Sequence, residues 1–227
     1  MKLFLVRNAE TEWNTEKRLQ GHQDSVLTGE GKQQSKRLAE LLKNEHFDAA
    51  FSSDLGRAID TAKTILESHA GIELHRKSEL RERSHGIVQG MTQREAFKKY
   101  PELQKQRLKD KFLFKNPKGE SYEDALKRLM PFWEELKEKH AGNNVLIVSH
   151  GGITRLLLSL TTNVSHEEVL SIDQPHDCIY VIEDADSNAV VKHLTSQGLL
   201  KGALKRVQLK KMPKPEEDED DIGFDDE

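Results

Sequence analysis

Cysteine, long apolar runs and aromatic residues are all scarce in this chain of 227 residues. The single cysteine, Cys178, excludes an internal disulfide and suits a reducing compartment. No apolar run approaches the roughly 20 residues that cross a bilayer, and the first residues form a strand-like run without a signal-peptide pattern. We therefore expect a cytoplasmic protein with no membrane partner.

Sequence patterns that hold metals or nucleic acids are also missing. The ten histidines include no H-E-x-x-H pattern, and a lone cysteine cannot form a C-x-x-C pair. We expect no bound metal and no cofactor on this basis. Aromatic residues make up only 6% of the chain and form no platform with basic neighbours, so we expect no nucleic-acid partner.

Acidic residues are concentrated at the C-terminus. Positions 216–227 hold nine acidic residues and no basic one, so the net charge of −4 becomes +5 when they are set aside. Such a run buries too little apolar surface to offset the entropy of ordering, and we expect 212–227 to be a disordered tail after a folded domain over 1–211. The tail is either a solubilising segment or an interaction segment, which binds a protein partner through Ile222 and Phe224 or covers a cationic pocket.

The rest of the chain predicts an α/β protein. Apolar runs of strand length alternate with segments whose apolar residues recur at helical spacing. We expect a three-layer sandwich in which helices flank a mostly parallel central sheet. The expected strands are 2–7, 48–52, 72–75, 144–148, 178–182 and 189–193, and the expected helices begin near Thr28, Leu55, Ser121, Gly151 and Ser165.

Four segments that contain candidate functional residues lie near predicted strand ends. Open α/β sheets bind ligands at such places because helix N-termini and free amides gather there. The first reads RNAET over 7–11, with Trp13-Asn14 and Gln20-Gly21 behind it. The others read SSDLGRAIDTA over 52–62, LRERSHG over 80–86 and VLIVSHGG over 145–152. Taken singly, each has a plainer explanation, such as a capped helix or a surface salt bridge between Glu82 and its flanking arginines.

Taken together, these segments resemble the histidine phosphatase superfamily, also called the phosphoglycerate-mutase-like family, whose first motif reads R-H-G-E-T. The resemblance implies a catalytic domain over 1–211 that transfers phosphoryl groups. Arg7 and Arg57 would hold the phosphate, since a guanidinium matches phosphate oxygens. Glu82 would supply and remove the proton, and His150 would stabilise the transferring charge. Contacts to substrate are implied for Asn14, Gln20, Gly21, Arg83 and Gly151.

Position 8 departs from the family pattern, which has its nucleophilic histidine there. The lone pair of the Asn8 amide is delocalised, so this side chain is neither a base nor a nucleophile. We expect a phosphomonoesterase of small phosphorylated metabolites, built to work through phosphohistidine, with nearly all turnover lost. Asn8 is either a substitution in a working enzyme, which the other intact positions favour, or native to a phosphate-binding pseudophosphatase.

The segment 92–118 bears on the substrate. Mutases of the family carry a longer basic insertion here, so the sequence favours release of inorganic phosphate from a small ester over a mutase reaction. Its basic residues predict a helical lid with a solvated face or, alternatively, a site for a second anionic group. These residues are Arg94, Lys98, Lys99, Lys105, Arg107, Lys109 and Lys111.

Overall fold

The computed structural model describes residues 1–162, 164–185 and 187–205, and the tail predicted at 212–227 lies outside them. The strands are β1 (Lys2–Arg7), β2 (Ala49–Ser53), β3 (Leu74–Lys77), β4 (Asn144–Ser149), β5 (Ile179–Glu183), β6 (Val190–Thr195) and β7 (Gly198–Lys201). The α-helices are α1 (Glu12–Thr15), α2 (Gly29–Leu42), α3 (Gly56–Leu66), α4 (Gln93–Lys99), α5 (Pro101–Lys109), α6 (Tyr122–Lys139), α7 (Gly151–Thr162) and α8 (His166–Ser171). Two short 3₁₀ helices, η1 (Ser78–Leu80) and η2 (Gly86–Val88), lie between β3 and α4.

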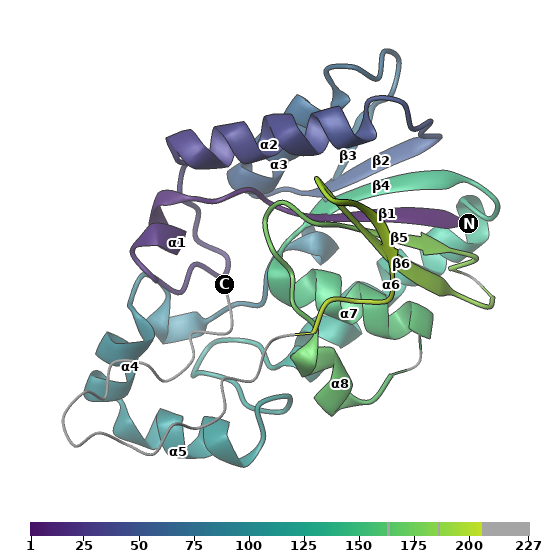
Figure 1. Ribbon diagram of the computed structural model, residues 1–227. Helices are drawn as coiled ribbons and strands as arrows, with labels where there is room; N and C mark the ends of the chain where they lie inside the picture. The colour runs from purple at the N-terminus through teal and green to yellow at the C-terminus, as the bar shows by residue number, and fades with distance from the viewer. Residues whose placement is uncertain (163, 186, 206–227) are drawn as a thin grey trace.

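The described strands form one mixed sheet in the order β3-β2-β4-β1-β5-β6-β7 (Figure 1). The first four strands in this order run parallel to one another. The last three continue the sheet in antiparallel fashion. Helices α2 and α3 cover one face and α6 and α7 the other, so the predicted three-layer α/β sandwich is confirmed. Its parallel part is confined to one half of the sheet.

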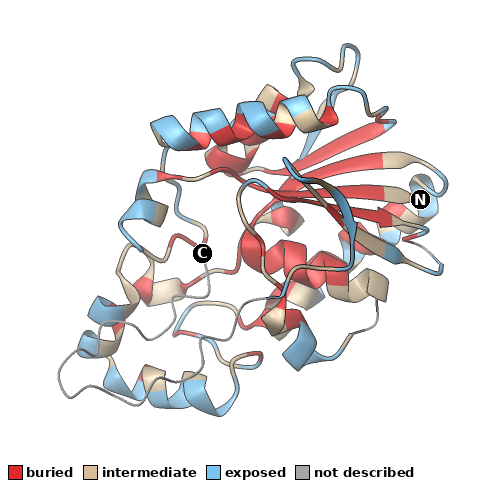
Figure 2. Ribbon diagram, viewed as in Figure 1, coloured by how far each residue is buried: buried red, intermediate tan, exposed pale blue. Residues whose placement is uncertain are grey.

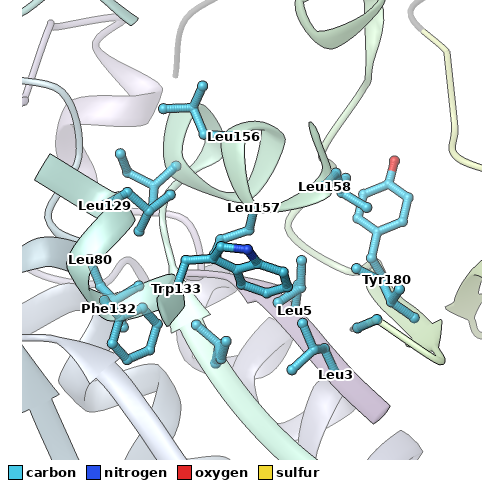
Figure 3. Close-up of a cluster of buried hydrophobic side chains, with 14 of the residues drawn as sticks. Leu3, Leu5, Leu80, Leu129, Phe132, Trp133, Leu156, Leu157, Leu158 and Tyr180 are labelled. Atoms are coloured by element: carbon cyan, nitrogen blue, oxygen red, sulfur yellow. The ribbon is translucent and has the colours of Figure 1, made fainter. Parts of the chain in front are cut away.

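The side chains of β1 alternate between two cores, as expected for a strand buried on both faces. Leu3 and Leu5 belong to the core beneath α6 and α7, where Trp133 also packs (Figure 3). Phe4 and Val6 belong to the core beneath α2 and α3. Figure 2 shows the resulting buried band, which runs along the central strands and the inner faces of the flanking helices. These two cores fix the positions at which β1 and β4 end.

Most predicted elements begin where the sequence indicates. Thr28 caps α2 by accepting a hydrogen bond from the Gly31 amide over 2.8 Å. Ser121 and Ser165 form capping boxes at the starts of α6 and α8. The third strand was predicted two residues too early, because the half-exposed sequence of β3 has no apolar pattern. Neither the four-residue helix α1 nor the edge strand β7 was predicted.

The segment 92–118, for which a helical lid was predicted, contains α4 and α5, and these two helices are called the lid below. Figure 1 shows that both helices, together with α1, lie beyond the carboxyl end of β1. A small separate core holds them there, in which Val88, Ala96 and Leu103 are buried. The residues that follow β1 and the lid therefore lie at the same end of the strands. No helix in the described ranges is both long enough and apolar enough to cross a membrane.

Candidate active site

Asn8 and His150 meet at the ends of two neighbouring strands. In the register of β1 and β4, Arg7 lies opposite Ser149. The backbone amide of Asn8 then donates a hydrogen bond of 2.7 Å to the Ser149 carbonyl. This bond brings His150, the residue after Ser149, next to Asn8. The Oδ1 atom of Asn8 lies 2.9 Å from Nδ1 of His150, and Nδ2 of Asn8 donates to the Ala9 carbonyl over 2.9 Å.

Burial determines the protonation state of His150, which is 2% exposed. Burial, together with the charges of Arg57 and Arg7, lowers the pKa of His150 well below its ordinary value, so the ring is neutral at pH 7. Because an amide oxygen can only accept, Nδ1 carries the hydrogen and Nε2 keeps its lone pair. The Nε2 atom has no hydrogen-bond partner among the described residues. A protonated His150 ring, which would stabilise a transferring phosphoryl group, thus requires an anion beside it.

Arg7 is supported by a loop between α8 and β5. Its Nη1 atom donates to the Gln174 carbonyl over 2.9 Å. In the same loop, Nδ1 of His176 lies 2.7 Å from the carbonyl oxygen of Asn8. Burial and the charge of Arg7 lower the pKa of His176 to about 3, so this ring is neutral and donates to that carbonyl. The loop therefore holds both the arginine and the backbone of the nucleophile position, a role for which the sequence contains no pattern.

Arg57 lies in the first turn of α3, as predicted, and is 3% exposed. Its guanidinium donates to the Gln23 carbonyl over 2.7 Å, to Oδ1 of Asp24 over 3.0 Å and to the Gly21 carbonyl over 2.9 Å. The Asp24 carboxylate also accepts from the Gly56 amide at the start of the helix. The loop after α1 thus orients the guanidinium, and part of its donor capacity is used within the protein.

Glu82 is 5% exposed and accepts two backbone hydrogen bonds. Its Oε1 atom accepts from the Arg83 amide over 2.7 Å and its Oε2 atom from the Gly152 amide over 2.9 Å. The Gly152 amide at the start of α7 thus points at the Glu82 carboxylate. A Cβ atom at position 152 would lie 2.4 Å from Oε1, so any larger residue there would displace the Glu82 carboxylate. Arg81, suggested as a salt-bridge partner of Glu82, pairs instead with Asp54 through contacts of 2.7 and 2.6 Å.

Three of the predicted substrate contacts, Asn14 on α1 and Gln20 and Gly21 in the loop after it, lie between β1 and α2. The Asn14 and Gln20 side chains are both tied to Thr11: Asn14 Oδ1 accepts from the Thr11 amide over 2.9 Å, and Gln20 Nε2 donates to the Thr11 hydroxyl over 2.8 Å. Gly21 has φ of +54°, a left-handed conformation that favours glycine. Their side chains and backbone shape the loop that holds Arg57, and Asn14 also lines a cavity beneath the lid.

The other two predicted contacts are Arg83, which follows Glu82, and Gly151, which follows His150. Arg83 packs over the Tyr122 ring, 4.0 Å from its centroid, and lines the same cavity as Asn14. Gly151 lies against Arg7, because a Cβ atom there would be 3.6 Å from the arginine Nε. The described contacts therefore bring Asn8, His150, Glu82 and Arg7 together at the start of α7. Arg83 and Asn14 line the cavity beneath the lid. The described part of the chain contains no group of three or more His, Cys, Asp or Glu residues placed to hold a metal ion.

An ion pair that the sequence did not predict supports Glu82 from behind. Arg128, on α6, donates to Oε1 of Glu120 over 2.8 Å and to its Oε2 atom over 3.0 Å. The same guanidinium donates to the Glu79 carbonyl over 2.7 Å and to the Arg81 carbonyl over 3.0 Å. Glu120 in turn accepts from the Ser84 amide over 2.9 Å. The backbone on both sides of Glu82 is thus fixed to α6.

The charge of Glu120 is stabilised by these contacts. Burial alone would raise the pKa of this carboxyl group, but His22, Arg128 and the Ser84 amide outweigh it and hold the pKa well below its usual range. A group whose pKa is depressed in the folded state contributes stability at pH values above its unfolded pKa. That contribution is lost as the pH falls toward the folded value.

Replacing Arg128 with methionine is expected to lower the free energy of unfolding by about 3 kcal/mol at pH 7, because the Glu120 carboxylate then loses its buried partner. The loss should shrink below pH 4, where protonated Glu120 no longer needs that partner. Urea unfolding at both pH values measures the effect. The matched control is Lys127→Met on the same helix, whose ion pair with Glu123 is exposed and should change stability by less than about 0.5 kcal/mol. Equal losses for the two variants at pH 7 would contradict the role given to Arg128.

Comparison with known proteins assigns the arrangement to a family. A sequence profile of the histidine phosphatase superfamily (branch 1) matches residues 3–197. The chain belongs to the histidine phosphatase superfamily. It is 32% identical over 206 residues to phosphoglycerate mutase-like protein 4 of Arabidopsis thaliana, covering 88% of this chain and 89% of that protein. It is also 35% identical over 206 residues to the metal-independent phosphoserine phosphatase of the same plant, covering 88% of this chain and 85% of the relative.

Solved structures agree with this membership. A mycobacterial glucosyl-3-phosphoglycerate phosphatase in complex with inorganic phosphate has a TM-score of 0.70 and 25% identity, covering 80% of this chain and 89% of the other. These relatives include phosphatases and a mutase-like protein. Membership of the superfamily therefore indicates an enzyme scaffold for phosphoryl transfer.

Proposed function

We propose that this histidine phosphatase is built as a phosphomonoesterase of small phosphorylated metabolites and that Asn8 removes nearly all of its turnover. The observation that carries the proposal is the contact between Asn8 and His150, in which Oδ1 of Asn8 lies 2.9 Å from Nδ1 of His150. The charges of Arg57 and Arg7 add to burial in lowering the pKa of His150, which supports the proposal that an anion binds beside this ring. A single buried cysteine fits the reducing cytoplasm in which we expect the protein to act.

In a chain with histidine at position 8, the reaction would have two steps. The imidazole would attack phosphorus while the ester P–O bond breaks and Glu82 gives its proton to the leaving oxygen. Water would then attack phosphorus as the P–N bond of phosphohistidine breaks, Glu82 would take the water's proton, and inorganic phosphate would leave. Through both steps Arg7 and Arg57 would balance the phosphoryl charge, because guanidinium donors match its equatorial oxygens.

Asn8 stops this sequence at its first step. Its amide nitrogen lacks a usable lone pair and already donates to the Ala9 carbonyl, so no covalent intermediate can form there. The groups that bind the phosphate are unchanged, so the chain would still bind phosphate esters. The other positions of the family pattern hold the residue types that the reaction uses: Arg7, Arg57, Glu82 and His150. We therefore favour a substitution in a working enzyme over a native pseudophosphatase.

A mutase is the alternative reaction, and the basic side chains beneath the lid favour it. Arg107 and Lys111 line a cavity there and could hold the second anionic group that a mutase substrate carries. The two reactions differ in what they need: a mutase requires a bisphosphorylated primer, whereas a phosphatase releases inorganic phosphate from a single ester without one.

The reaction type is tested with the Asn8→His variant. We expect it to release inorganic phosphate from phosphoserine and other small monoesters with no primer present, as measured by a colorimetric phosphate assay. The parent chain, assayed in parallel, controls for contaminating phosphatases. Interconversion of 3- and 2-phosphoglycerate that needs added 2,3-bisphosphoglycerate, with little phosphate release, would favour the mutase instead. A variant that performs neither reaction would contradict both proposals.

A further inference from the structure

A cationic cavity lies beneath the lid, beside the residues proposed for phosphoryl transfer. It has a volume of about 250 Å³ and is bordered by the loop after β1, by Arg83 and by helices α4 and α5. Its described lining contains four basic side chains and no acidic one, and it also has apolar walls. The residues that matter here are Lys17, Arg83, Arg107 and Lys111, with Phe97 and Phe114. A ligand that fits this cavity is therefore anionic and carries an apolar group.

The described chain ends at the loop between α8 and β5. Lys205 forms a β-bridge with Ile172, and the Leu204 carbonyl accepts from the Asp173 amide over 2.8 Å. The next residue of that loop, Gln174, binds Arg7 through its carbonyl. The chain therefore leaves the described structure beside the loop that supports the phosphate-binding arginine.

The 22 residues that follow, 206–227, have the length and the chemistry to reach the cavity. An extended chain spans about 3.3 Å per residue, so residues 206–215 can span up to roughly 33 Å before the acidic run begins. Within 216–227, nine carboxylates surround two apolar residues, Ile222 and Phe224. This composition matches a cavity with basic side chains and aromatic walls.

We propose that residues 216–227 bind in this cavity within the same chain and compete there with anionic substrates. This inference rests on the proposed function only in taking the substrate to be a phosphate ester whose remaining part lies beneath the lid. The carboxylates pair with the basic lining and Phe224 packs against Phe97 and Phe114. The same molecule then carries a weak inhibitor of its own site, and ionic strength sets how strongly it acts.

Competition is measured with a full-length variant in which each of the nine tail carboxylates becomes its amide, Asp→Asn and Glu→Gln. Calorimetric titration with 3-phosphoglycerate at about 20 mM salt is expected to give roughly tenfold tighter binding for this variant than for the parent chain, since a tethered segment acts at an effective concentration of about 1 mM. At 0.5 M salt the two affinities should converge. Equal affinities at low salt would overturn the proposal. A gain that depends on protein concentration would place the tail in a second copy and overturn it as well.

The location is measured separately, with a fluorescein-labelled peptide of sequence 216–227 added to the amide-tail variant. Fluorescence anisotropy is expected to show binding that falls at least tenfold when Arg107→Ser and Lys111→Ser are added. The matched control is Lys105→Ser with Lys109→Ser, which removes the same charge from exposed positions on α5 outside the cavity and should change affinity less than twofold. If both pairs weaken binding equally, the tail is attracted by general charge and the cavity site is wrong. Neither measurement needs turnover, so an inactive Asn8→His variant would sink the proposed function without affecting this result.

Discussion

Replacing Asn8 with histidine is expected to raise kcat by a factor on the order of 10⁴ or more, the size of the loss when a covalent nucleophile is removed from other enzymes. The local structure is suited to an imidazole. Nδ2 of Asn8 donates to the Ala9 carbonyl over 2.9 Å, and Asn matches His as far as that ring position. An Nδ1–H of histidine can make the same bond, which leaves the lone pair on Nε2 for attack on phosphorus.

The gain is measured as the initial rate of phosphate release, together with detection of the phosphorylated intermediate by mass spectrometry at alkaline pH. Asn8→Gln serves as the control, because it keeps an amide and should stay as slow as the parent chain. Phosphorylation should be found at position 8 and should be absent from the control. A parent chain that already turns over within tenfold of the histidine variant would mean that another group accepts the phosphoryl, and the role given to position 8 would be wrong.

The elements that position the site were predictable because their signals are local. β1 and β4 read as apolar runs buried on both faces, and the residues that follow each run are the ones the structure brings together. Thr28 and Ser121 cap helices through side-chain bonds three residues away, a spacing visible in the sequence. Buried strand length and capping depend on neighbours in sequence, so single-sequence patterns capture them.

The support of the site was not predictable, because it depends on contacts between distant residues. Asp24 binds Arg57 from 33 positions away, and Arg128 reaches back 47 positions to the Arg81 carbonyl. A lone aspartate in a loop and a lone arginine on a helix resemble ordinary surface charges. Their function follows only from the folded geometry, as does the use of the Gly152 amide by Glu82.

The lid shows a third case, in which the pattern was visible and its meaning was not. The basic residues of 94–111 predicted either a solvated face or an anion site, and the structure divides them between the two. Lys105 and Lys109 are exposed on α5, whereas Arg107 and Lys111 line the cavity. Helical spacing alone cannot tell which face of so polar a helix meets the protein, because its apolar residues are too few to mark one.

Replacing Glu82 with glutamine in the Asn8→His background is expected to lower kcat for alkyl phosphates by about 10²–10⁴-fold, the usual contribution of a general acid. An alkoxide is a poor leaving group, and among the described residues Glu82 is the carboxylate that the Gly152 amide binds. Glutamine keeps the size of the side chain, but it can accept through only one oxygen. One of the two bonds from the Arg83 and Gly152 amides is therefore lost, and thermal unfolding must be checked alongside the rates.

The leaving group separates proton transfer from a structural defect. With p-nitrophenyl phosphate, whose leaving oxygen needs no proton, the Glu82→Gln enzyme should form phosphohistidine at a rate close to that of its Asn8→His parent. Its second step should remain slow, because water still lacks a base, so a burst of nitrophenol followed by slow turnover is expected. Rates that fall equally for alkyl and aryl esters, with no burst, would indicate that Glu82 positions the Gly152 turn instead of transferring the proton.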